Sequence, residues 1–399
     1  MRRVSVASWF ALLGVVLVVA ASIAAWLLAE RVARSVLVPT PYALQAEFEV
    51  LDVERLAPDG DGRERARVRL PLAPARELRQ FTRVDAEGRY GLLWDDAGGI
   101  GHGPLGPVEA RDDRSVTRTL TVVAGAPPAA LAPARLDVTL FRRDPLRDHA
   151  LAFEEVDIDG PVGPVAAWWL PADPDSAVVM LHGRRRGDRS EALRALPTVV
   201  ASGASVLVSS YRNHDRSAMS PDGFFHYGAS EADDLLAALA WLRERGVARV
   251  VLVTYSMGGA VAMTARERWP SQGPELLGVT MDAPLVDPRT VFAGVAARAG
   301  VPGPVAGLGL WLAQRRSGVD YAPLDLRAHA NALDVPLLLH ATRGDGTIPI
   351  ALVDDFAARV PTGLLRYRRL EEGDHVEAWN VDPDGYEAAL AAFLRDVLR

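Results

Sequence analysis

Three residues of the types needed for nucleophilic catalysis follow one another in the second half of the chain: Ser256, Asp345 and His375. A serine hydroxyl attacks well only when a base takes its proton. The base in turn needs a carboxylate that fixes its tautomer and stabilises the imidazolium that forms. The three side chains therefore predict a catalytic centre in which Ser256 is the nucleophile, His375 the base and Asp345 the acid.

Ser256 lies at a predicted turn between a strand and a helix, in the segment VTYSMGGA at residues 253–260. Such a turn exposes the hydroxyl, and small residues beside it let the strand and the helix approach each other closely. Gly258 and Gly259 meet this need. Thr254 departs from the motif G-x-S-x-G, because a β-branched side chain replaces the first glycine and adds bulk beside the turn. The prediction of a catalytic serine therefore depends mainly on its partners.

Those partners follow other apolar runs. The run at residues 335–340 leads into the loop with Asp345, and the run at 364–370 leads to His375. The carboxyl ends of parallel strands meet at one edge of a sheet, where ligands bind. Asp282 also follows an apolar run, at 277–281, so it is an alternative acid for the same base.

The apolar run at 178–181 ends in His182-Gly183-Arg184, near the start of the predicted sheet. We expect the backbone N–H groups of Arg184 and Met257 to form an oxyanion hole for a tetrahedral intermediate. Arginines at 184, 185, 186 and 189 surround this position. They predict either a solvated basic surface or a subsite for an anionic substrate group.

After about residue 151, apolar runs alternate with amphipathic stretches. The predicted strands are 165–170, 177–181, 205–209, 247–253, 277–281, 335–340 and 364–370, and the predicted helices are 191–201, 231–245 and 261–268. Ser230 and Asp233 form a capping-box pattern before the second helix, and Gly246 provides a stop. This alternation predicts an α/β fold whose mostly parallel sheet has helices on both faces.

The remaining segments predict two further regions and an insertion. Residues 39–150 consist of short alternating runs between turns, which is typical of a small β-rich accessory domain, and we expect His102 there to be an exposed loop residue. A catalytic domain at 151–399 then contains an insertion at about 284–333, in the position of a helical cap. Its Phe292, Trp311 and Tyr321 either line an acyl pocket or pack the cap's own helices.

The N-terminal segment 1–35 carries an uncharged run from Val4 to Ala29. At about 1.5 Å per residue, a helix of this length can cross a hydrocarbon core of about 30 Å. We therefore predict a single-pass transmembrane anchor rather than a cleaved signal peptide or a buried soluble helix. The balance of arginines around the run favours an N-terminus inside and an extracytoplasmic catalytic domain.

Composition limits the partners. The 44 basic residues are all arginine and are outnumbered by 51 acidic ones, for a net charge of -7, so no nucleic-acid-binding surface is expected. There is no cysteine, and no metal-ligand spacing or cofactor motif occurs. We expect neither a metal nor a cofactor.

From about Phe153 to Arg399 the chain resembles the α/β-hydrolase superfamily, especially membrane-anchored bacterial members of its serine aminopeptidase-like and esterase-like branch. The motifs that carry this resemblance are Leu181-His182-Gly183, Ser209-Ser210-Tyr211-Arg212-Asn213, Tyr255-Ser256-Met257-Gly258-Gly259, Asp345 with Ile348-Pro349, and Gly373-Asp374-His375. The resemblance implies an eight-stranded sheet with one antiparallel strand near its start. It also implies the same triad and the oxyanion hole from the Arg184 and Met257 amides.

These features predict a serine hydrolase that cleaves carboxylic esters, or short peptides or amides, of a small-molecule acyl substrate. An acyltransferase with the same triad is the second interpretation. A catalytically silent hydrolase fold that acts as a membrane-tethered binding module is the third, and Thr254 is the feature that favours it. Fold-level resemblance does not identify the acyl group, the acceptor or the oligomeric state.

Overall fold

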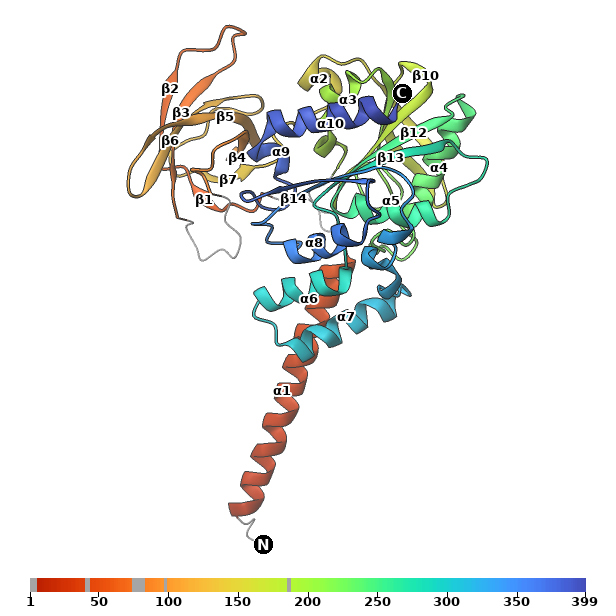
Figure 1. Cartoon of the computed structure of the whole chain (residues 1–399). Coiled ribbons are helices and arrows are strands. Elements are labelled where there is room, and N and C mark those ends of the chain that lie inside the picture. Colours follow the sequence, from red (N-terminus) through yellow and green to blue (C-terminus); the bar gives the residue numbers. More distant parts are fainter. Residues whose placement is uncertain (1–5, 40–43, 74–82, 97–98, 185–187) are drawn as a thin grey trace.

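The computed structural model describes residues 6–39, 44–73, 83–96, 99–184 and 188–399. It contains a projecting N-terminal helix, a seven-stranded sheet and a larger eight-stranded sheet that carries helices (Figure 1). The eight-stranded sheet and its helices contain every predicted site residue.

Helix α1 spans Val6–Leu37. Its segment Leu13–Leu37 is long and apolar enough to cross a membrane by length and composition, and its most apolar 18 residues have a mean hydropathy of 2.2. Side chains between Leu13 and Leu27 are exposed around the helix, whereas Ala29, Ala33 and Leu37 are buried in the core of the larger sheet. The helix therefore has a projecting part and a docked part.

The seven-stranded sheet is antiparallel throughout, in the order β1-β7-β4-β5-β6-β3-β2. Its strands are β1 (Phe48–Glu49), β2 (Asp52–Leu56), β3 (Arg65–Pro71), β4 (Tyr90–Asp96), β5 (Gly99–Arg111), β6 (Ser115–Thr121) and β7 (Pro133–Asp137). The expectation for His102 is wrong. The residue is buried in β5, and its Nε2 lies 3.3 Å from Oδ2 of Asp137. The glycines on both sides of it suggested a loop, but they lie within the strand.

The eight-stranded sheet confirms the predicted fold class. Its order is β15-β14-β13-β12-β10-β11-β9-β8, and β9 is antiparallel to both of its neighbours. The strands are β8 (Glu154–Gly160), β9 (Gly163–Leu170), β10 (Asp173–Leu181), β11 (Ala204–Ser209), β12 (Arg249–Tyr255), β13 (Glu275–Asp282), β14 (Leu337–Thr342) and β15 (Leu365–Leu370).

Helices bury both faces of this sheet. Successive side chains of a strand point to opposite faces. Along β10, Val179 and Leu181 belong to one core cluster, and Val178 and Met180 belong to the other. The first cluster includes residues of α4 (Glu231–Glu244), α5 (Met257–Glu267) and α8 (Ile350–Arg359). The second includes residues of α3 (Leu196–Val200), α9 (Ala378–Val381) and α10 (Pro383–Val397).

The other helices are α2 (Pro145–His149), α6 (Pro288–Arg298), α7 (Gly303–Ser317) and the 3-10 turns Arg189–Ala192, Ala322–Leu324, Leu326–Ala328 and Ala330–Ala332.

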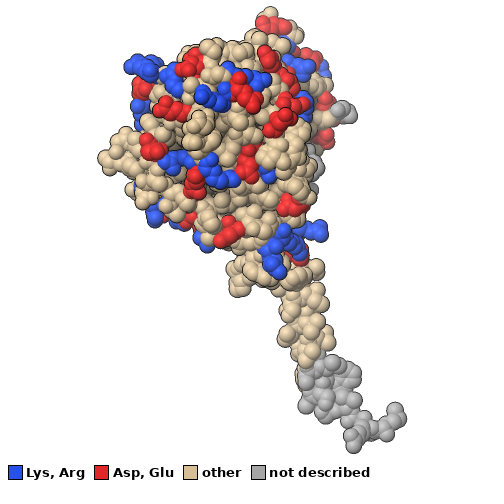
Figure 2. All heavy atoms as spheres, turned by 90° about the vertical axis from the view of Figure 1, so that its right-hand side faces the viewer, with Lys and Arg blue, Asp and Glu red and all other residues tan. Residues whose placement is uncertain are grey.

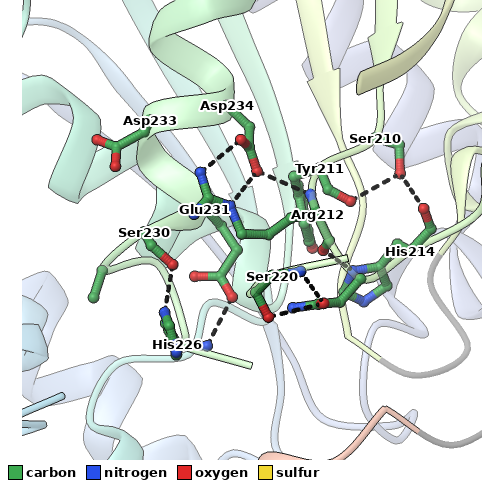
Figure 3. Close-up of polar contacts among 12 residues, drawn as sticks. Ser210, Tyr211, Arg212, His214, Ser220, His226, Ser230, Glu231, Asp233 and Asp234 are labelled. Carbon is green, nitrogen blue, oxygen red and sulfur yellow. Dashed lines mark hydrogen bonds and ion pairs between the residues drawn. The ribbon is translucent and has the colours of Figure 1, made fainter. Parts of the chain in front are cut away.

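Two local predictions are wrong. The helix predicted at 191–201 is a 3-10 turn followed by the short α3, since Pro197 lies within the run. The capping box before α4 does not form, because Ser230 makes no side-chain cap bond and its hydroxyl pairs with Nδ1 of His226. The Glu231 carboxylate instead accepts the His226 N–H at 2.8 Å (Figure 3). It also accepts the Gly228 N–H at 2.9 Å.

The docked part of α1 contacts the hairpin of α6 and α7. A Cβ atom at Gly309 of α7 would lie 2.7 Å from Cβ of Val32 and 2.9 Å from the carbonyl oxygen of Ala29. The absence of a side chain therefore allows the two helices to touch. Arg316 at the end of α7 adds a two-pronged ion pair with Glu30.

We predict that Gly309→Ala undocks α7 from α1 and lowers the free energy of unfolding by about 1–3 kcal/mol, which is typical of overpacking. Gly307→Ala in the same helix is the matched control. A Cβ there meets nothing within 4 Å, so the better helix propensity of alanine should raise stability by up to about 1 kcal/mol. Thermal unfolding in detergent measures the stability of both variants. Equal changes in stability for Gly309→Ala and Gly307→Ala would contradict this account of the contact between α7 and α1.

Candidate active site

The backbone presents Ser256 at a strained turn between β12 and α5. Its φ of 47° and ψ of -112° are rare for a residue with a side chain. The turn also needs space, because a Cβ at Gly258 would lie only 2.6 Å from the carbonyl oxygen of Leu181 on β10. The strain and the close approach together project the hydroxyl beyond the sheet edge, as a nucleophile elbow requires.

Thr254 fits into this elbow without displacing it. Its side chain is buried, and its hydroxyl donates to the carbonyl oxygen of Thr280 on the neighbouring β13 at 2.8 Å. A Cβ at Gly259 would lie 3.6 Å from that hydroxyl. The threonine therefore points toward β13, and the space beside Gly259 would accommodate even a Cβ atom next to its hydroxyl.

The structure brings Ser256, His375 and Asp345 together. Nε2 of His375 lies 2.8 Å from Oγ of Ser256, and Nδ1 lies 2.8 Å from Oδ2 of Asp345. The imidazole therefore links the hydroxyl to the carboxylate through its two nitrogens. Each of the three side chains follows the carboxyl end of a different strand, β12, β14 or β15.

Backbone hydrogen bonds fix the two loops that carry Asp345 and His375. Oδ1 of Asp345 accepts the backbone N–H groups of Thr347 and Ile348 at 2.7 Å each, which leaves Oδ2 for the imidazole. Asp374 accepts the N–H groups of Gly346 and His375, also at 2.7 Å, and so joins the two loops. The sequence showed Asp374 only as a neighbour of the histidine, because its partners lie in another loop.

The electrostatics distinguish the two candidate acids. Burial alone would lower the pKa of His375, but the charge and hydrogen bond of Asp345 outweigh it and raise the pKa above its ordinary value. Asp282 is fully buried, and burial raises the pKa of its carboxyl to about 7 despite the nearby Arg194 charge. Among the described residues, Asp345 contacts the imidazole, whereas neither carboxylate oxygen of Asp282 has a hydrogen-bond partner. The geometry therefore favours Asp345 as the acid.

The loop after β10 lies against the nucleophile. A Cβ at Gly183 would lie 3.0 Å from Cβ of Ser256. The Gly183 N–H donates to Glu191 at 2.6 Å, and the hydroxyl of Tyr211 donates to the carbonyl oxygens of His182 and Gly183 at 2.7 and 3.1 Å. This loop carries the Arg184 amide, next to the turn that carries the Met257 amide.

The Arg184 side chain extends away from the nucleophile to the end of α1. Its Nη2 donates to the carbonyl oxygens of Ser35 and Val36 at 2.7 and 2.8 Å. Its guanidinium carbon lies 5.0 Å from the ring centroids of both Phe225 and Tyr227. A helix C-terminus leaves carbonyl groups without helical partners and carries partial negative charge, so a guanidinium stabilises it.

The described arginines near this loop, Arg184 and Arg189, do not form the predicted basic surface. Arg189 is buried, and it pairs with Glu155 at 2.7 Å and Asp215 at 2.5 Å beneath the ring of Trp168. Arg185 and Arg186 lie outside the described residues. Neither Arg184 nor Arg189 therefore belongs to a solvated basic patch.

The predicted cap residues divide into two groups. Phe292 and Tyr321 are buried and pack against each other and Tyr227, with ring centroids 4.6–5.9 Å apart. Trp311 on α7 is 54% exposed.

In the part of the chain that the structure describes, no cluster of three or more His, Asp or Glu residues is arranged to hold a metal ion.

The seven-stranded sheet contacts the segment that follows His375. Asn380 of α9 is fully buried, and its Nδ2 donates to the carbonyl oxygens of Arg89 and Val138 at 2.7 and 2.9 Å. Arg194 donates to Oδ1 of Asn380 at 3.2 Å and to the carbonyl oxygen of Val376 at 2.9 Å. One amide side chain therefore links the histidine loop to the other sheet.

A second contact runs beside the first. Glu377 accepts the Asp374 N–H at 3.0 Å and the Tyr90 hydroxyl at 3.4 Å. Gly88 approaches so closely that a Cβ would lie 2.1 Å from the Asn380 carbonyl oxygen. No sequence signal marked these residues, since their partners are almost 300 positions away.

We predict that Asn380→Ala loosens the histidine loop, because it leaves two part-buried carbonyl groups without their Asn380 donor at a cost of up to about 1–3 kcal/mol. Amide hydrogen exchange over residues 374–381 should accelerate. Asn331→Ala is the control, since Asn331 is exposed in the same half of the chain. Unchanged exchange in the Asn380 variant would show that this contact does not hold the loop.

The chain was compared with protein families, with curated proteins and with solved structures. Residues 78–137 match a family described as a domain of unknown function, DUF8805. A search of curated proteins finds no match. Among solved structures, the esterase Pf2001 of Pyrococcus furiosus is similar in two crystal forms. One has 20% identity over 65% of this chain and 96% of that chain with a TM-score of 0.52, and the other has 21% identity over 65% and 97% with a TM-score of 0.50.

At this identity the likeness concerns the fold. It covers nearly the whole esterase and about two thirds of this chain, which corresponds in extent to the eight-stranded sheet and its helices. The chain therefore has the α/β-hydrolase fold, accompanied by an N-terminal apolar helix and a separate β-rich sheet.

Proposed function

We propose that this chain is a membrane-anchored serine hydrolase that cleaves carboxylic esters through an acyl-enzyme on Ser256. The observation that carries the proposal is the position of the His375 imidazole, 2.8 Å from both Oγ of Ser256 and Oδ2 of Asp345. The similarity of fold to an esterase supports the choice of ester over peptide or amide.

In the first half of the proposed reaction, Oγ of Ser256 attacks the ester carbonyl and its proton passes to Nε2 of His375. The carbonyl oxygen becomes an oxyanion, which the backbone N–H groups of Arg184 and Met257 stabilise. The intermediate collapses and breaks the bond to the alkoxy oxygen, which leaves as the alcohol with the proton from His375. Asp345 stabilises the imidazolium between these two proton transfers.

In the second half, water attacks the acyl-enzyme and His375 takes its proton. Collapse of the second tetrahedral intermediate releases the carboxylic acid, and the proton returns to Oγ of Ser256. Atoms balance as ester and water giving acid and alcohol. Each step uses the same base and the same oxyanion donors, so the site needs no further group.

The anchoring part of the proposal concerns α1. Its projecting part exposes apolar side chains such as Leu17 and Ile23 around the helix, and such a surface is stable in hydrocarbon rather than in water. Its docked end belongs to the hydrolase core through Ala33 and Leu37. That burial favours an anchor retained in the mature protein over a cleaved signal peptide. We propose an extracytoplasmic head, as the sequence predicts.

A fluorophosphonate probe tests the nucleophile, since it reacts with activated serine hydroxyls. We expect the full-length protein in detergent to be labelled and Ser256→Ala to remain unlabelled. Ser230→Ala is the control, because Ser230 is placed outside the triad and should label normally. Equal labelling of the protein and of Ser256→Ala would exclude Ser256, and no labelling of the folded protein would exclude the enzyme.

The pH dependence tests the base. His375 acts only when neutral, and its pKa is raised above the ordinary value of 6.5. Ester hydrolysis should therefore increase with pH through a midpoint above 6.5. Asp345→Asn removes the charge that raises this pKa, so the midpoint should fall and kcat should drop by up to about 10⁴-fold. Asp282→Asn is the matched control and should retain most activity. The reverse ranking in steady-state assays would show that Asp282 is the acid.

A further inference from the structure

The hairpin formed by α6 and α7 lies where the projecting part of α1 joins the rest of the molecule. In Figure 1, α7 crosses α1 on the side of the head from which the helix projects. A small apolar cluster connects the three helices and consists of Val32, Ala296, Val301 and Ala306, with Leu28 and Val305 packed against it. The hairpin is thus the part of the head nearest to the exposed apolar length of α1.

Helix dimensions place the hairpin close, along the axis of α1, to the point where the exposed apolar part of α1 ends. Leu27 is the last strongly exposed apolar residue before the docked part, and α7 touches α1 at Val32. Five residues advance a helix by about 7–8 Å, and side chains reach about 5–6 Å from a helix axis. The outward face of α7 therefore comes within a few ångströms of the level of Leu27.

Basic residues predominate in the hairpin. Residues 288–319 contain four arginines, Arg289, Arg298, Arg315 and Arg316, and no acidic residue, in a chain whose net charge is -7. Asp287 and Asp320 flank this range, and Asp287 pairs with Arg289 at 3.8 Å. The docked part of α1 adds Arg31 and Arg34, and its one acid, Glu30, pairs with Arg316. Figure 2 shows basic side chains gathered where the head meets the projecting helix. This distribution complements the negative charge of anionic lipid headgroups.

The hairpin also exposes large apolar side chains. Trp311 of α7 is 54% exposed and Val295 of α6 is 45% exposed. Pro304, Gly307 and Trp311 recur at spacings of three and four residues, so they share one exposed face of α7, and Arg315 continues that face four residues after Trp311. Tryptophan is enriched at the boundary between hydrocarbon and water, because its ring is apolar and its N–H remains hydrated. An exposed tryptophan beside arginines is typical of an interfacial helix.

We propose that the α6–α7 hairpin is a membrane-docking surface that lies on the anionic headgroup region beside α1. The proposal rests on the membrane anchoring proposed above, and it adds a second contact that limits how the head can tilt. The surface is connected to the active site. The chain between β13 and α6 contains Leu285, whose N–H donates to the carbonyl oxygen of Ser256 at 3.1 Å. The docked hairpin would hold this segment, and with it the elbow, at a defined height above the bilayer.

The absence of cysteine from the chain makes a site-specific test possible. Three single variants of the full-length protein, Trp311→Cys, Met219→Cys and Leu17→Cys, are labelled with an environment-sensitive fluorophore. They are then reconstituted in vesicles of phosphatidylcholine and phosphatidylglycerol. Met219 is the matched control, since it is 55% exposed, compared with 54% for Trp311, but lies outside the hairpin. Leu17 reports on the projecting part of α1. A lipid spin label near the headgroup reports by quenching on positions 219 and 311. A spin label in the middle of the acyl chain reports on position 17, which lies about 15 Å along the helix from Leu27.

We expect a blue-shifted, quenched label at positions 17 and 311 and an unquenched label at position 219. Quenching at position 17 with position 311 as unquenched as 219 would overturn the docking surface while the anchor stands. No quenching at position 17 would overturn the anchor and the docking surface together. Quenching at 311 that is equally strong in vesicles of phosphatidylcholine alone would overturn the role assigned to the arginines. Catalytic activity enters none of these readouts, so the hydrolase proposal is tested separately.

Discussion

The imidazole of His375 must reach two side chains that come from different strands, and much of the architecture follows from this constraint. Oγ of Ser256 and Oδ2 of Asp345 both lie 2.8 Å from it, so an error of one ångström in either loop would break the link. A parallel sheet solves the problem because its carboxyl strand ends meet at one edge. The order β15-β14-β13-β12 brings the three loops within reach of one another.

Loops alone would not hold such distances. Backbone N–H groups bind Asp345 and Asp374 and fix the loops to each other, and the sheet beneath them is covered on both faces by packed helices. The strained backbone of Ser256 persists because these surroundings determine it. Asn380 extends this support to the seven-stranded sheet. This contact suggests a physical reason for the β-rich sheet to lie beside the histidine loop.

Helix α1 changes character along its length. Its projecting part is apolar on all sides, whereas its docked part buries Ala29 and Ala33 and has its terminal carbonyl groups capped by Arg184. Because the Arg184 amide is a proposed oxyanion donor, the same residue connects the end of the apolar helix to the reaction centre. The helix is therefore a structural component of the fold as well as a candidate anchor.

The sequence by itself determined the fold class, most of the strands and the long apolar helix, because alternating runs and an uncharged segment are local patterns that survive folding. It also singled out Ser256, Asp345 and His375 from their order after three apolar runs. It left Asp282 open as the acid, since both aspartates follow strands and only distances separate them. It misjudged His102, whose flanking glycines indicate a loop although the strand continues through them.

Only the tertiary structure decided what each long side chain does. Arg184 and Arg189 look alike in a basic run, but one caps α1 and the other is buried with two carboxylates. Ser230 matches a capping pattern, but its hydroxyl bonds His226. Asn380, Tyr90 and Gly88 carry no pattern at all. The physical reason is the same in each case: these interactions join residues whose proximity depends on the packing of distant elements, and no local periodicity records it.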